Sequence, residues 1–150
     1  MKGIPAIAFV SLLGIAASSF AADGLVSIKS PYPVVQTIDR LESGANNRGL
    51  KVFARIDHAA GATSVGKNLR PTELLIFGNP QRGTPLMECA QSAGIDLPLK
   101  ALAWQDEQGQ VWLGYNDPGC LAKRHGITSC PAVEPIGKAL SGLVSEAVAR

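Results

Sequence analysis

An aspartate and a histidine stand next to each other where an apolar strand is expected to end. Asp57 and His58 follow FARI, in which apolar and polar residues alternate as in a strand with one buried face. Imidazole exchanges protons near neutral pH, so His58 is a candidate general base. Neighbouring strand residues point to opposite faces, so Asp57 would orient His58 only if the strand has already ended.

Four further polar residues lie at or just after the ends of other predicted strands. Asn79 comes directly after TELLIFG, and Tyr115, Asn116 and Asp117 close the segment QVWLGYND. We expect the strands before His58 and Asn79 to lie side by side and to stop at one edge of a sheet. The grouped donors, acceptors and imidazole would then form a small-ligand pocket. The alternative is that His58 and Asn79 only satisfy loop backbone groups near the strand ends.

Motifs of well-known enzymes and metal sites are missing from the sequence. There is no GxSxG, no paired-cysteine redox motif and no dinucleotide fingerprint. His58 and His125, the two histidines, have none of the spacings typical of zinc or haem sites. A copper site from Met87, Cys89 and a histidine is an alternative, but MECA is more simply part of a helix core. We therefore predict no catalytic set and no metal site, and the cofactor stays unknown.

The N-terminus has the composition of a secretory signal. Lys2 precedes the apolar stretch IPAIAFVSLLGIAASSFAA, which ends in small residues. We predict a signal peptide over residues 1–21, cleaved between Ala21 and Ala22, and a periplasmic or secreted protein with no membrane attachment after cleavage. An uncleaved anchor is the alternative, but Ile4 to Ala17 is shorter than the ~20 residues that span a membrane.

Three cysteines follow this segment, and export would expose them to an oxidising environment. Cys120 and Cys130 enclose a short loop and are predicted to form a disulfide, which would restrict the unfolded chain by about 2 to 3 kcal/mol. Cys89 is then interpreted as a small buried hydrophobic residue rather than a reactive thiol or metal ligand.

The charge balance argues against a nucleic-acid partner. The chain has 14 basic and 12 acidic residues, and only Lys2 lies in the predicted signal peptide, so 13 basic residues remain. A nearly neutral domain without a basic run lacks the electrostatic footprint of nucleic-acid binding. Lys123, Arg124 and His125 are interpreted as a solvated helix end.

Periodicity and turn residues predict one α+β domain over residues 22–150, in the order β-α-β-β-α-β-β-α-α. It would consist of a single antiparallel sheet with helices on one face. Leu74 to Phe77 show no alternation, so this strand is expected to be central and covered on both faces. Trp104 and Trp112 are expected to pair across a hairpin. The predicted helices span 34–45, 84–94, 118–126 and 136–147, and the strands lie near 25–28, 53–57, 72–78, 100–105 and 110–115. Residues 59–71 are expected to be a loop with one helical turn, the alternative being a loop whose backbone amides bind an anion.

Several linked motifs resemble one known family. ARIDHAAGA, PTELLIFGNP, GTPLM, GIDLPLKALAWQDEQGQVWLGYNDP and LAKRHGI, together with their spacing, are similar to the domain of unknown function 302 (DUF302) family from about Gly24 to Val148. The resemblance implies a small α+β sandwich akin to TATA-box-binding-protein-like folds, frequent export and dimerisation through the sheet. It implies no activity, because none is established for the family. The positions that match its signature are Asp57, His58, Phe77, Gly78, Asn79, Pro80, Leu97, Pro98, Tyr115, Asn116 and Asp117, whereas the Cys120 to Cys130 loop is not part of it.

The leading functional hypothesis is an exported, non-enzymatic module that binds a small ligand in a polar pocket around His58 and Asn79, and that forms a homodimer. An enzyme that uses His58 as base with Tyr115 or Asp117 is the second hypothesis. A partner-binding domain is the third, and its sign would be an apolar exposed sheet around Trp104 and Trp112.

Overall fold

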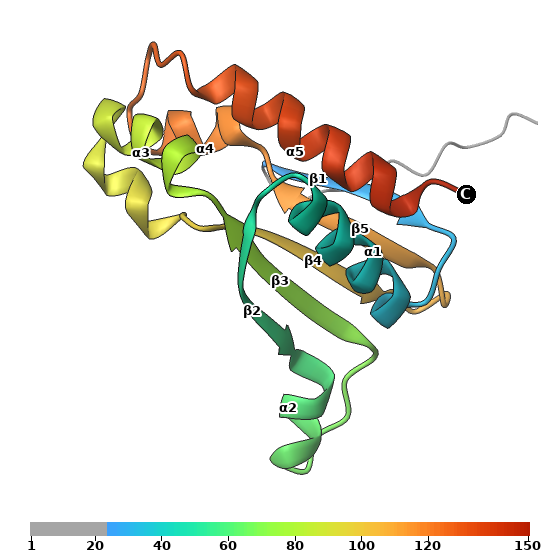
Figure 1. Ribbon diagram of the computed structural model, residues 1–150. Helices are drawn as coiled ribbons and strands as arrows, with labels where there is room; N and C mark the ends of the chain where they lie inside the picture. The colour runs from blue at the N-terminus through green and yellow to red at the C-terminus, as the bar shows by residue number, and fades with distance from the viewer. Residues whose placement is uncertain (1–23) are drawn as a thin grey trace, which may run out of the picture.

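A five-stranded antiparallel sheet organises residues 24–150, the part of the chain that the computed structural model describes (Figure 1). The strand order is β1-β5-β4-β3-β2, which confirms the predicted α+β class with a single sheet. The predicted signal peptide over residues 1–21 lies outside the described residues. The strands are β1 (Leu25–Ser30), β2 (Lys51–Asp57), β3 (Thr72–Gly78), β4 (Leu99–Gln105) and β5 (Val111–Asn116).

Two helices, α1 (Val34–Asn47) and α5 (Val133–Val148), lie side by side on one face of this sheet (Figure 1). Each has an apolar stripe at helical spacing, and the stripe of α1 contains the fully buried Ile38 and Leu41. The two helices approach closely at Gly44, where an added Cβ would lie 2.9 Å from Leu143 Cδ1. The main core therefore lies between these helices and the inner face of the sheet, where it includes Leu75, Phe77, Ala101, Ala103, Leu113, Leu140, Leu143 and Val144.

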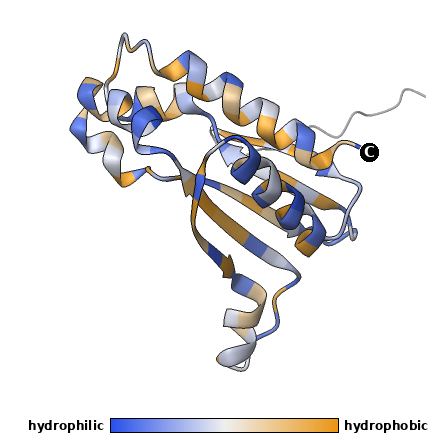
Figure 2. Ribbon diagram, in the orientation of Figure 1, coloured by the Kyte–Doolittle hydropathy of each residue, from blue (hydrophilic) through white to orange (hydrophobic). Residues whose placement is uncertain are grey.

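Strand β3, which was predicted to be central and covered on both faces, is an interior strand between β2 and β4, but it is not covered on both faces. Its buried residues alternate, with Leu75 and Phe77 facing the core and Leu74 and Ile76 half-buried on the other face. The apolar run in the sequence, which makes much of β3 orange in Figure 2, comes from an apolar outer face rather than from a second layer of helices. A register shift between Val52 and Ala54 also breaks the alternation predicted for β2.

The β4–β5 hairpin forms as predicted, and Trp104 pairs with Trp112 across it. Its turn is held by Asp106, whose Oδ1 accepts hydrogen bonds from the backbone N–H groups of Gln108 and Gln110. The indole Nε1–H of Trp112 donates to Asp106 Oδ2 at 2.7 Å, and this hydrogen bond lowers the pKa of the carboxyl group. The hairpin is thus fixed by both ladder pairing and side chains.

Two helices begin at places where the sequence predicted otherwise. The segment after β2, expected to be a loop with one helical turn, starts with the seven-residue helix α2 (His58–Ser64), which is capped by Asp57 and projects beyond the sheet without a buried residue (Figure 1). Helix α3 (Pro80–Cys89) begins at Pro80 rather than Thr84, because Asn79 caps it. The 3-10 helix η1 (Gln91–Ile95) and α4 (Pro118–Arg124) complete the fold, and no helix among residues 24–150 has the length and apolar content of a membrane span.

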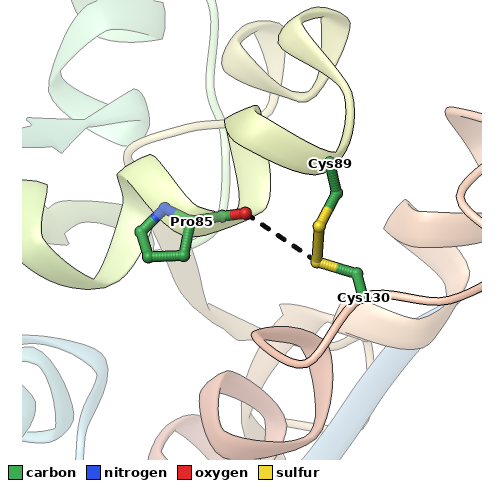
Figure 3. Close-up of a disulfide and its surroundings, with 3 residues drawn as sticks. All are labelled: Pro85, Cys89 and Cys130. Carbon is green, nitrogen blue, oxygen red and sulfur yellow. Dashed lines mark hydrogen bonds between the residues drawn. A yellow bond between two sulfur atoms is a disulfide. The ribbon is translucent and has the colours of Figure 1, made fainter.

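The disulfide joins Cys89 to Cys130, so the predicted Cys120–Cys130 pair is wrong (Figure 3). The Cα atoms of Cys89 and Cys130 lie 6.0 Å apart, and the Cys130 sulfur lies 3.8 Å from the Pro85 carbonyl oxygen. Cys120 is the free thiol, and it sits in the first turn of α4 against Gly24. Closeness in sequence pointed to the wrong partner because α4 carries Cys120 away from the loop that ends at Cys130.

Candidate functional site

The predicted site does not exist as one site, because His58 and Asn79 lie at opposite ends of the sheet. Strands β2 and β3 are antiparallel, with Lys51 opposite Gly78 and Asp57 opposite Glu73. The chain leaves β2 at one end and β3 at the other, about 20 Å apart at the usual rise of a strand. Asp57 and His58 are therefore separated from Asn79 and from residues 115–117, which share the other end.

Most of the predicted site residues have structural roles. Asp57, Asn79 and Asp117 are N-caps, and their side chains accept hydrogen bonds from the backbone N–H groups of Ala60, Gln81 and Cys120, respectively. Tyr115 is 7% exposed within the main core, whereas Asn116 is exposed at the end of β5. His58 is exposed on α2. The alternative that the side chain only satisfies loop backbone groups therefore describes Asn79, and no such hydrogen bond is formed by His58 among the described residues.

A cavity of about 300 Å³ opens at the Asn79 end of the sheet. Its walls come from the ends of β2 and β3, from α3, from the segment around Gly94 and Leu97, and from α5. The lining is almost entirely apolar and includes Phe53, Met87, Leu97, Leu99, Ile136 and Leu140. Its volume and lining are those of a small-molecule site, and Asn79 is the one predicted site residue that reaches it.

Two arginines and one amide provide the main polar groups of the cavity. Arg48 is already engaged, because its guanidinium contacts the Glu146 carboxylate at 2.6 Å and the Ala139 carbonyl oxygen at 3.1 Å. Asn79 Nδ2 donates to the Gly49 carbonyl oxygen at 3.3 Å. Arg82 is exposed, and none of the ion pairs formed within residues 24–150 includes it. It is the cation at the cavity that can take an anionic partner.

The disulfide holds two walls of this cavity together. Cys89 ends α3, which contributes Met87 to the lining, and Cys130 precedes α5, which contributes Ile136. A small second core beneath this region contains Leu86, Ala93 and Ile136, with Cys130 packed against it. The cross-link therefore fixes the spacing of α3 and α5 on either side of the opening.

A second group of polar residues, which sequence spacing did not indicate, connects η1 with the end of α4. The ring of His125 contacts Ser92 Oγ through Nδ1 at 2.9 Å and Asp96 Oδ2 through Nε2 at 2.6 Å. Arg124 contacts the other carboxylate oxygen of Asp96 at 3.0 Å. Lys123 and Arg124 are exposed, as expected for a solvated helix end, but the side chain of His125 is only 7% exposed.

An ion-pair network joins the sheet to α1 at a third place. Arg55 contacts Asp39 at 2.6 Å, Glu42 at 3.3 Å, and also Glu73. The hydrogen bond with Glu73 raises the pKa of the Arg55 guanidinium. Glu73 is 7% exposed, so Arg55 neutralises a carboxylate that has little contact with water.

The suggested copper site finds no support in the described part of the chain. Cys89 is oxidised to a disulfide and has no thiolate to donate, while Met87 lines the apolar cavity. Within residues 24–150, no three residues of the histidine, cysteine, aspartate and glutamate types form a group that could hold a metal ion.

The fold and the motif pattern place the chain in a known family. It belongs to the family described as "Domain of unknown function DUF302", which matches residues 26–147. A solved structure, the uncharacterized conserved protein DUF302 from Bacillus stearothermophilus, superposes with a TM-score of 0.74 over 84% of this chain and 99% of that one. The two sequences are 21% identical, so this likeness concerns the fold alone.

Closer in sequence are two proteins of Brucella. "Fluoride-specific ion channel FluC 1" of Brucella suis biovar 1 is 49% identical over 119 residues, which cover 78% of this chain and 47% of that protein. "Fluoride-specific ion channel FluC 2" of Brucella melitensis biotype 1 has the same identity over 78% of this chain and 44% of its own length. The chain thus spans less than half the length of these relatives.

Proposed function

We propose that this domain binds a small amphipathic molecule, apolar along most of its length and anionic at one end. The observation that carries the proposal is the apolar cavity of about 300 Å³ with Arg82 and Asn79 beside it. From the N-terminal sequence we further propose that the protein is periplasmic or secreted, so that binding takes place outside the cytoplasm.

Apolar contact would supply most of the affinity in this cavity. Removing apolar surface from water contributes about 25 cal/mol per Å², and Met87, Leu97 and Ile136 offer such surface on three walls. A ligand with a polar middle would leave its polar groups without partners there. An anionic end would instead stay at the opening, where Arg82 adds a charge-assisted hydrogen bond.

We expect straight-chain carboxylates to raise the melting temperature, with an effect that grows with chain length, and the matched alcohols to do so less. A ligand at about 100 times its Kd stabilises the folded state by about 2.7 kcal/mol, which a thermal-shift measurement resolves. In Arg82→Gln the carboxylate should lose its advantage over the alcohol while the dependence on chain length remains. Lys67→Gln removes the same charge at the other end of the sheet and should change neither.

Filling the cavity provides the second arm of this experiment. A Cβ added at Gly83 lies 3.5 Å from Leu97 Cδ1, an ordinary contact, so Gly83→Leu should extend into the cavity without unfolding the protein. We expect this variant to keep its fold and lose the response to every carboxylate. A wild type that no compound stabilises, or a Gly83→Leu variant that responds like wild type, contradicts the proposal.

Fluoride belongs in the same ligand series because of the Brucella relatives. Their names describe transport of fluoride by proteins of which this chain spans less than half. A fluoride-dependent stabilisation that Arg82→Gln abolishes would favour an anion-binding role related to those proteins over the amphipathic ligand.

A second candidate function is self-association through the outer face of the sheet. This face is not covered by α1 or α5, and it presents Leu74, Ile76, Leu102, Trp104 and Trp112, all half-buried, together with Ile56, which is 39% exposed. The Trp104 indole lies against Gly114, where an added Cβ would be 2.9 Å from it. A second copy would cover this apolar face through a two-fold interface.

We expect Ile56→Glu to shift the protein toward the monomer in sedimentation equilibrium, because the carboxylate would be buried between two copies. Val35→Glu introduces the same charge on α1, at a residue that is 58% exposed, and should leave the mass of the oligomer unchanged. A wild type that is monomeric at all concentrations contradicts the homodimer and leaves the ligand proposal untouched.

A further inference from the structure

We propose that Ser92, His125 and Asp96 form a nucleophilic site that cleaves carboxylic esters, independent of the cavity and of the proposed ligand. The three side chains are hydrogen-bonded in series, with Ser92 Oγ 2.9 Å from His125 Nδ1 and Asp96 Oδ2 2.6 Å from His125 Nε2. A hydroxyl, a base and a carboxylate that orients the base are the parts of an acyl-transfer site, which geometry rather than sequence order identifies.

The carboxylate determines which ring nitrogen of neutral His125 carries the proton. An ionised carboxylate only accepts hydrogen bonds, so the nitrogen that faces Asp96, Nε2, must donate. Nδ1 then has a lone pair directed at Ser92 and accepts a hydrogen bond from the Ser92 hydroxyl group. This tautomer makes the imidazole a base toward Ser92, which is the arrangement that activates a serine hydroxyl.

The surroundings expose the nucleophile and protect the base. Ser92 is exposed on η1, whereas the side chains of His125 and Asp96 are 7% and 12% exposed. Arg124 contacts Asp96 Oδ1 at 3.0 Å, so both carboxylate oxygens have partners. An ester can therefore reach Ser92 while the ring and its carboxylate are held in one orientation.

The backbone also holds these residues in place. Ser92 and Asp96 lie on either side of Ala93, which is 1% exposed in the small core under η1. The N–H of His125 donates to the carbonyl oxygens of Leu121 and Ala122 at 3.2 Å, which fixes His125 at the end of α4. The Cys89–Cys130 disulfide also connects the two segments that carry these residues, because Cys89 directly precedes η1 and Cys130 follows α4.

In the proposed reaction, Ser92 Oγ attacks the ester carbonyl carbon while its proton moves to His125 Nδ1. The bond to the alcohol oxygen then breaks, and the alcohol leaves with the proton from Nδ1, so that an acyl ester of Ser92 remains. A water molecule attacks this ester with Nδ1 as the base and releases the carboxylic acid and the serine. Each step is a proton transfer or substitution, so no oxidant or reductant is required.

A fluorophosphonate probe tests the nucleophile directly, because Oγ displaces fluoride from phosphorus and the adduct is stable. We expect one adduct per chain by intact mass and, after peptide mapping, its location at Ser92. p-Nitrophenyl acetate should acetylate the same residue. Ser92→Ala removes an exposed hydroxyl, should stay folded and should abolish both adducts, whereas Ser64→Ala, on exposed α2, should keep them.

The base is tested with the second histidine as a matched control. We expect His125→Ala to slow labelling of Ser92 by about 100-fold, and His58→Ala to leave the rate unchanged. No adduct on the folded wild type, an adduct at another serine, or equal rates in folded His125→Ala and wild type would overturn the proposal.

Asp96 is a positioning residue, and its test is spectroscopic. The chain has two histidines, so ¹⁵N spectra of histidine-labelled protein show the ring of each. In wild type we expect the neutral ring of His125 to carry its single proton on Nε2. The Asp96→Asn variant should lose this tautomer preference, and its Ser92 should be labelled more slowly. A His125 ring protonated at Nδ1 in wild type would refute the mechanism, whatever the stability of the variants.

Discussion

Cys89→Ser and Cys130→Ser are each expected to lower the free energy of unfolding by about 4 kcal/mol, whereas Cys120→Ser should change it by less than about 1 kcal/mol. The Cys89–Cys130 bond closes a segment with a sequence separation of 41, and the entropy that a cross-link removes from the unfolded chain grows with that length. Cys120 forms no cross-link and only fills space against Gly24. Urea unfolding of the oxidised proteins measures the difference.

Thiol mapping checks the pairing itself. Under denaturing, non-reducing conditions the wild type should react with one equivalent of alkylating reagent, at Cys120. Adding a reductant should lower the stability of wild type and Cys120→Ser to that of Cys89→Ser. Alkylation at Cys89 instead would restore the pairing of Cys120 with Cys130 and contradict the structure.

Arg55→Met should lower the free energy of unfolding by about 3 kcal/mol. The substitution keeps an apolar stem but leaves Glu73, which is 7% exposed, without its cationic partner. A buried carboxylate without a partner is expensive, whereas a pair of apolar residues is not. The double variant Arg55→Met/Glu73→Leu should therefore recover most of the loss.

Arg70→Met is the matched control for this substitution. Arg70 contacts Glu107 at 3.8 Å, and both side chains are more than half exposed, so the loss should stay below about 1 kcal/mol. Urea unfolding of wild type, Arg55→Met, Glu73→Leu and the double variant measures the coupling between Arg55 and Glu73. A double variant as unstable as Arg55→Met would show that Glu73 carries no uncompensated charge.

Local patterns in the sequence predicted the elements well. The apolar stripe beginning at Val34 is the buried face of α1, and the tryptophans of the hairpin pair as expected. The order of strands and helices also indicated the class of fold. These features depend on residues close in sequence, whose spacing directly reflects the geometry of a helix or a strand.

The predicted site failed on strand direction. His58 and Asn79 both follow strands, but consecutive strands without a crossover helix between them run antiparallel and end at opposite edges. Helix α2 in the connection is only seven residues long and extends away from the sheet, so it forms no crossover. The sequence did not indicate the cavity because its lining comes from four separate stretches of the chain, residues 48–53, 77–87, 94–99 and 136–143, whose apolar residues are also typical of an ordinary core.

The group around His125 could not be recognised from sequence spacing. Ser92 and His125 are separated by 33 positions, and their contact depends on how η1 and α4 pack. The predicted disulfide is wrong for a related reason, since Cys120 and Cys130 are close in sequence, whereas Cys120 lies in α4 and Cys130 is bonded to Cys89 at the end of α3. In both cases tertiary packing, rather than a local rule, selects the partner.

Helix α2 should open locally more easily than the rest of the domain. It has no buried residue, and Val65, which follows it, is 71% exposed, so little free energy opposes its fraying. Amide protons of α2 should exchange with deuterium long before those of β3 and β4. A fluorophore or tag inserted between Gly61 and Val65 would thus report on the molecule without disturbing the distant cross-linked end.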